Sequence, residues 1–111
     1  MARINYVELP VADVPVAKAF FENAFGWSLS DFGPTYAATT TGDVDLGLQG
    51  DTSEATAAPL ALIEVDDLEA ALTAVTNAGG SITHPIFAFP GGRRFHFVVP
   101  GGGELAAVRS T

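Results

Sequence analysis

The chain has 111 residues, of which 48% are hydrophobic and 16% are charged, and this composition excludes a disordered polypeptide. A net charge of −8 argues against a nucleic-acid partner, and the absence of cysteine excludes disulfides and thiolate metal sites. No apolar run is long enough to cross a bilayer, and no basic segment followed by an apolar one opens the sequence. We therefore expect a cytoplasmic protein with no membrane partner.

The first half of the chain predicts one strand, one helix and three further strands. Residues 4–11 alternate as in a strand, which places Val7 and Leu9 on a core-facing side and leaves the opposite side to more polar residues. Asp13 is suited to cap the helix that follows, and Gly26 is suited to end it. Further strands are expected at 27–32, 35–41 and 44–49.

Three phenylalanines occupy the predicted first helix. Phe20, Phe21 and Phe25 recur at helical spacing, and this pattern is typical of the buried face of an amphipathic helix. We therefore predict that all three belong to the core.

The second half of the chain repeats the first. Residues 60–81 match the pattern of residues 6–27, with Asp66 or Asp67 as the cap of a second helix and Gly79-Gly80 at its end. Three more strands are expected at 81–87, 93–99 and 104–108. His84 precedes a proline and is predicted to be an exposed turn residue.

The repeat predicts an α+β fold of two β-α-β-β-β modules, about 1–50 and about 60–111, joined by a linker at 51–59. Half-size units cannot each bury a core, so we expect one domain over 1–111, with a curved, half-open mixed sheet around a central cavity and the helices outside. Tyr6 and Glu8 share the strand face that would line this cavity.

The motifs AFFENAFGW in the first helix and FHFVVPGGGELA near the end resemble the glyoxalase, bleomycin-resistance and dioxygenase superfamily, also called the vicinal-oxygen-chelate superfamily. The resemblance covers essentially the whole chain and is nearest to uncharacterised glyoxalase-like members. It implies the paired-module fold and a homodimer, because modules of this superfamily commonly pair within or between chains.

Metal-using members of this superfamily carry four ligands, and the resemblance places these positions at Tyr6, Gly47, Leu60 and Ala106. None of these residues is His, Glu, Asp or Gln. Transition-metal sites need N or O donors at about 2.0–2.2 Å, which glycine, leucine and alanine side chains do not supply. The nearest donors, Gln49 and Glu104, stand two positions away. We therefore expect no metal and no other cofactor.

Six residues are candidate ligand contacts: Tyr6, Glu8, Trp27, Tyr36, Arg94 and His96. Glu8 would anchor a cationic or hydrogen-bonding ligand, although a wet rim position or an internal pair with Arg94 also explains a carboxylate there. His96 shares a strand face with Arg94 and is either a hydrogen-bonded structural residue or an acid–base group. Trp27, Tyr36, Phe87 and Phe89 are candidate apolar walls, as in bleomycin-type binders, or core residues.

Three functions stay open on this sequence. The first is a metal-free protein that binds a small organic molecule, sequestering an antibiotic or metabolite. The second is a metal-independent isomerase or lyase that uses Glu8 or His96 as a general base. The third is a structural or regulatory partner module, which a filled interior would support.

Overall fold

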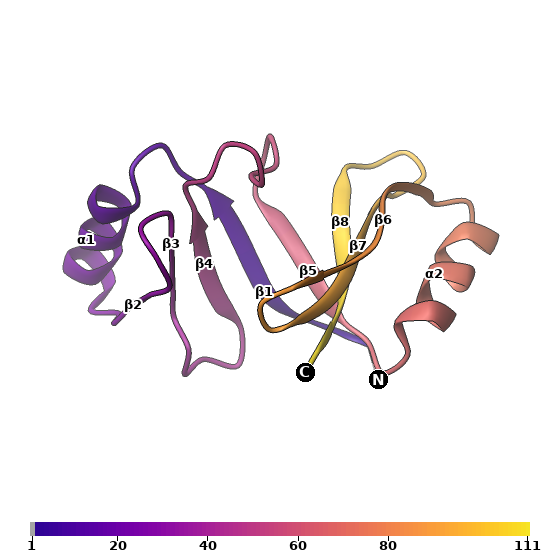
Figure 1. Ribbon diagram of the computed structural model, residues 1–111, viewed down its shortest axis with the longest axis horizontal. Coiled ribbons are helices and arrows are strands. Elements are labelled where there is room, and N and C mark those ends of the chain that lie inside the picture. Colours follow the sequence, from indigo (N-terminus) through magenta and orange to yellow (C-terminus); the bar gives the residue numbers. More distant parts are fainter. Residues whose placement is uncertain (1) are drawn as a thin grey trace. The chain divides into compact units, whose positions relative to one another are not determined.

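The computed structural model describes residues 2–111, which form two helices and eight strands (Figure 1). The first half contains β1 (Arg3–Pro10), α1 (Val14–Phe25), β2 (Ser30–Asp31), β3 (Tyr36–Ala38) and β4 (Asp45–Gln49), and the second contains β5 (Leu60–Glu64), α2 (Leu68–Asn77), β6 (Ser81–Phe89), β7 (Gly92–Val98) and β8 (Glu104–Ser110). The predicted α+β class and the repeated β-α-β-β-β order are confirmed. Two compact units result: the first unit is residues 6–60, and the second unit is residues 2–5 with 61–111.

In the first unit, β1 runs parallel to β4, which pairs antiparallel with β3, and β3 pairs antiparallel with β2. The Asp13 side chain caps α1 by accepting a hydrogen bond from the Val16 amide at 3.1 Å. Gly26 ends the helix in the left-handed region, with φ 71°, where a side chain would be strained. The buried cluster beneath α1 comprises Val14, Leu29, Ala37 and Leu48, with Leu9, Val11, Ala17, Phe21 and Leu46 packed against it.

The prediction that all three helix phenylalanines are core residues is wrong for two of them. Only Phe21 packs against the buried cluster, whereas Phe20 and Phe25 are 57% and 59% exposed. The neighbouring strands β2 and β3 have two and three residues, so they cover a narrow stripe of α1. The aromatic rings instead pack on one another, and Phe21 stacks on Trp27 with ring centroids 5.5 Å apart.

In the second unit, β5 runs parallel to β8, which pairs antiparallel with β7, and β7 pairs antiparallel with β6. Asp67, and not Asp66, caps α2 by accepting a hydrogen bond from the Ala70 amide at 3.0 Å. Alternate residues of β7 face the helix, because Phe95 and Phe97 join Leu68 in the buried cluster beneath α2. Arg94 and His96 therefore lie on the opposite face of β7.

Two strand predictions differ from the structure in extent. The second and third strands were expected at 27–32 and 35–41, but β2 and β3 are much shorter because Leu29 turns into the core and Gly33-Pro34 interrupts the chain.

His84 is exposed as predicted, but it lies within β6 and not in a turn. Proline is tolerated beside it because β6 pairs on one side only within this unit. Neither helix in residues 2–111 is long and apolar enough to cross a membrane.

Candidate functional site

The first unit brings Tyr6, Tyr36 and Glu8 into one hydrogen-bonded chain, called here the tyrosine chain. Tyr6 and Glu8 share a face of β1, and Tyr36 opens β3. The two phenol oxygens lie 2.5 Å apart, and the Tyr36 hydroxyl donates to Glu8 Oε2 at 3.0 Å. Since Tyr36 uses its proton on the carboxylate, Tyr6 is the donor to the Tyr36 oxygen. The three side chains thus form a relay of donors that ends on the carboxylate.

Burial determines the electrostatics of the tyrosine chain. Glu8 is only 5% exposed, and a carboxylate at such a position needs hydrogen bonds to compensate for lost hydration. Burial, followed by the charge of Glu8 and the proximity of Tyr6, raises the pKa of Tyr36 well above its ordinary value. Tyr36 therefore remains a hydrogen-bond donor at neutral pH and does not become a phenolate.

Gly47 provides the space that the two phenols occupy. It lies directly opposite Glu8 on β1 and opposite Ala38 on β3. A Cβ atom built on Gly47 would lie 2.1 Å from the Tyr36 hydroxyl and 2.1 Å from the Tyr6 hydroxyl. Any side chain at this position therefore collides with the tyrosine chain.

The four positions to which the resemblance assigns metal ligands, Tyr6, Gly47, Leu60 and Ala106, supply too few donor atoms to hold a metal ion. Gly47 has no side-chain donor atom, and the hydroxyls of Tyr36 and Tyr6 fill the space that a side chain there would occupy. Tyr6 is itself another of the four positions. At the other two, Leu60 and Ala106 are 1% and 0% exposed hydrocarbon. A transition metal requires three or four N, O or S donors, and these residues supply one neutral phenol between them.

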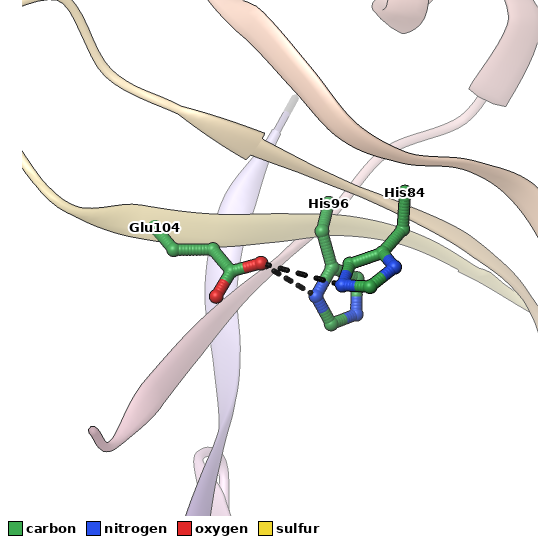
Figure 2. Close-up of side chains that lie close together, drawn as sticks. All are labelled: His84, His96 and Glu104. Atoms are coloured by element: carbon green, nitrogen blue, oxygen red, sulfur yellow. Dashed lines mark hydrogen bonds and ion pairs between the residues drawn. The ribbon is translucent and has the colours of Figure 1, made fainter. Parts of the chain in front are cut away.

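The second unit contains a separate group, His84, His96 and Glu104, called here the histidine cluster (Figure 2). His84 on β6 and His96 on β7 are direct cross-strand partners, and Glu104 opens β8. Glu104 Oε2 lies 3.1 Å from His96 Nδ1 and 3.8 Å from His84 Nε2. Register shifts in β6 on either side of His84 orient its ring, which meets the His96 ring edge-on at 4.6 Å.

His96 is the buried member of the histidine cluster, with 3% of its surface exposed. Its Nδ1 donates to the Glu104 carboxylate, while its Nε2 has no hydrogen-bond partner among residues 2–111. Burial, followed by the charge of Arg94, lowers the pKa of His96, and the hydrogen bond to Glu104 offsets only part of this effect. The imidazole is therefore neutral at pH 7, with a lone pair on Nε2.

Arg94 lies beside His96 on the same face of β7 and packs against two aromatic rings. Its guanidinium carbon is 5.3 Å from the centroid of Phe87 and 5.1 Å from that of Phe89, within the range of cation–π attraction. The two rings that the sequence suggested as apolar walls thus support this side chain.

The remaining candidates lie elsewhere in their units. Trp27 stacks on Phe21 beside α1, on the helix side of the strands, whereas the tyrosine chain occupies the opposite face. In the second unit, the Glu64 carboxylate accepts hydrogen bonds from Asn5 at 3.3 Å and Ser110 at 3.2 Å. The six predicted contacts therefore separate into the tyrosine chain, the Arg94–His96 face of β7 and Trp27.

Sequence reasoning missed two members of the histidine cluster, His84 and Glu104. Glu104 had been noted only as a donor two positions from Ala106, and strand alternation places these two residues on the same face of β8. That alternation was a usable signal, since Ala106 pairs directly with His96. The approach of His84 depends on the register shifts in β6, for which the sequence carries no signal.

The chain belongs to the Glyoxalase/Bleomycin resistance protein/Dioxygenase superfamily, whose family model matches residues 3–105. This match confirms the resemblance drawn from the helix and C-terminal motifs. A comparison with curated proteins finds no match.

Solved structures share the fold. A superfamily member from Vibrio splendidus 12B01 is 19% identical with a TM-score of 0.76, over 99% of this chain and 100% of that one. Methylmalonyl-CoA epimerase from Mycobacterium tuberculosis is 17% identical with a TM-score of 0.77, over 97% and 87%. The Mn(II)-bound glyoxalase from Novosphingobium aromaticivorans is 19% identical with a TM-score of 0.70, over 98% of this chain and 40% of that one. Likeness at these identities establishes the fold alone.

Proposed function

We propose that this chain binds a small organic molecule without using the metal position of its superfamily. The observation that carries this proposal is the tyrosine chain, whose phenols fill the space above Gly47 where a ligating side chain would stand. In this proposal, the buried carboxylate of Glu8 and the phenols of Tyr6 and Tyr36 replace the metal ligands of other superfamily members. They bind by hydrogen bonding and charge in place of coordination.

The chemistry of the tyrosine chain favours a ligand that donates hydrogen bonds or carries positive charge. Glu8 is a buried acceptor, and Tyr36 is kept in its neutral, donating form. The net charge of −8 adds an attraction for cations at longer range. An amine, amidine or guanidine attached to an apolar body matches these features, and sequestration of an antibiotic or metabolite of this kind is the role we propose. Arg94 and His96 stay predicted ligand contacts of the second unit.

Protein-observed NMR with a small library tests this proposal. The probes are aromatic amines, amidines and guanidines, each accompanied by a neutral alcohol of the same shape. We expect the cationic probes to shift the resonances of Tyr6 and Tyr36, and Glu8→Gln to abolish the preference over the alcohols. Glu69→Gln is the matched control, because Glu69 is an exposed carboxylate paired with Arg93 on the surface. Equal binding of amines and alcohols, or shifts confined to other residues, would contradict the proposal.

A metal-independent isomerase or lyase is the second candidate, and one observation favours it. The Glu104 carboxylate orients the His96 ring through Nδ1, which leaves a lone pair on Nε2 in the manner of a general base. Glu8 is less suited to this role, because its Oε2 already accepts the hydrogen bond from Tyr36. Incubation with α-hydroxyketones and malonyl thioesters in D₂O tests this alternative. Deuterium incorporation that His96→Gln removes would favour the enzyme, and no incorporation would leave the binding role alone.

The homodimer and the cytoplasmic location remain part of the proposal. Exposed aromatic side chains at Phe20, Phe25 and Trp27 provide an apolar surface on the first unit that a second copy can cover. Light scattering coupled to gel filtration measures the mass directly. A mass equal to that of one chain across a wide concentration range contradicts the dimer.

A further inference from the structure

The histidine cluster has the composition of a metal site, although it does not use the superfamily's metal positions. Two imidazoles and one carboxylate contribute one donor atom each, and these atoms lie within 4.8 Å of one another. We infer that His84, His96 and Glu104 bind one divalent transition-metal ion of the zinc class. The inference concerns the second unit and is independent of the proposed function of the tyrosine chain.

The distances require only a small adjustment of one side chain. Two donors that share one ion at about 2.0–2.2 Å each lie at most about 4.4 Å apart. Glu104 Oε2 already satisfies this limit with both rings, at 3.1 Å from His96 Nδ1 and 3.8 Å from His84 Nε2. The His84 side chain is 57% exposed, so its ring is free to turn toward the other two donors. The buried His96 and the strand pairing hold the rest in place.

The donor set indicates which metals suit the site. Neutral imidazoles with a carboxylate suit zinc, nickel, cobalt and iron, whereas calcium and magnesium prefer oxygen donors alone. Three protein ligands leave positions for water or substrate, as in open zinc sites. Thr83 Oγ1 donates to Glu104 Oε2 at 3.0 Å and so orients the carboxylate, in the way that outer hydrogen bonds support metal ligands.

Binding at His96 Nδ1 requires a proton to move within the ring. That proton is now donated to Glu104, and it passes to Nε2, the ring nitrogen that has no partner among residues 2–111. The ring remains neutral, and because Nε2 then carries the proton, a metal-bound His96 does not act as the general base of the alternative function. The charge of Arg94 acts on His96 and opposes a cation, so we expect weaker binding than at a closed structural zinc site.

A zinc titration followed by long-range ¹H–¹⁵N NMR of the imidazoles tests the inference without ambiguity, because the chain has only two histidines. The protein is first treated with a chelator and then titrated with Zn²⁺. We expect saturation at one ion per chain, with large shifts of His84 Nε2 and His96 Nδ1. Unmoved imidazole resonances at millimolar Zn²⁺ overturn the inference.

Three variants separate this site from unspecific binding. His84→Ala and Glu104→Gln each lower the zinc affinity by about 10-fold or more, since the first removes one ligand and the second replaces a charged carboxylate with a neutral amide. The amide NMR spectrum checks that each of these two variants is folded. Glutamine has nearly the same shape as glutamate, so Glu104→Gln still allows the hydrogen bond from Thr83. Glu69→Gln, a surface carboxylate, leaves the affinity unchanged. Equal affinity in all three variants overturns the inference.

The outcome is separable from that of the proposed function. If zinc shifts the ring resonances of Tyr6 and Tyr36 and leaves both imidazole resonances unmoved, both proposals fail. The first unit would then bind metal, and the histidine cluster would not. Failure of the amine probes at the tyrosine chain does not affect the zinc result.

Discussion

Replacing Gly47 with alanine tests the packing beneath the tyrosine chain. The new Cβ would lie 2.1 Å from both phenol oxygens and 2.8 Å from Tyr36 Cζ, whereas an ordinary contact is about 3.5 Å or more. Both hydroxyls must retreat by more than about 1 Å, which breaks the bond between the phenols and the one to Glu8. Overpacking destabilises the fold by about 1–3 kcal/mol, and loss of a hydrogen bond to a charged group by about 1.5–3 kcal/mol. Replacing glycine also reduces the conformational freedom of the unfolded chain, which offsets about 0.4–1 kcal/mol of this loss.

We therefore expect Gly47→Ala to lower the free energy of unfolding by about 2–5 kcal/mol, which corresponds to about 4 °C or more in Tm for each kcal/mol. Urea unfolding followed by the fluorescence of the single tryptophan measures it. Gly103→Ala is the matched control, because its Cβ would have no neighbour within 4 Å. In a background with phenylalanine at positions 6 and 36, the cost of Gly47→Ala should fall by about 1 kcal/mol or more. A Gly47→Ala variant as stable as the control would refute the reasoning.

Three further predictions concern pH and helix capping. Burial and a neighbouring carboxylate raise the pKa of Tyr36, so folding favours its protonated form. The free energy of unfolding should therefore be highest below the ordinary tyrosine pKa of about 10 and fall as the pH rises above it. Denaturation curves measure this loss, and Tyr36→Phe should reduce it. Burial and a neighbouring guanidinium lower the pKa of His96, so as the pH falls this residue is protonated in the unfolded chain before it is protonated in the folded one. The free energy of unfolding should therefore fall as the pH drops through about 6.5. His96→Gln, measured with a chelator present, should flatten this dependence. Asp67→Ala removes the cap of α2 and should cost about 1 kcal/mol in urea unfolding, whereas the exposed Asp43→Ala should cost nothing measurable.

The fold was predictable wherever a residue's role is local. Asp13 and Gly26 bound the first helix as expected, because a capping side chain and a left-handed glycine act within one turn. The burial of the helix phenylalanines was not predictable from periodicity. A helical stripe shows which residues share a face, but the area that covers the face depends on neighbouring strands, which are short here and leave Phe20 and Phe25 exposed.

The candidate site was predictable only in part. Strand alternation placed Tyr6 and Glu8 on one face, and Tyr36 was recognised as a candidate. The hydrogen bonds among them depend on the β3–β4 register over Gly47, which the sequence does not encode locally. The histidine cluster depends on still less local information, since a register shift in β6 directs His84 toward Glu104, a residue on another strand.

The central claim is that the superfamily's metal position in this chain holds phenols and no metal. Native mass spectrometry of the His84→Ala variant tests it most directly, because this substitution removes one ligand of the histidine cluster and so weakens metal binding there, while it leaves the tyrosine chain intact. The protein is exposed to Mn²⁺, Ni²⁺ and Zn²⁺ and then desalted into a volatile buffer. The account predicts the mass of the chain or its dimer without a metal ion, with or without an organic adduct. One transition-metal ion retained per chain in this variant would contradict it.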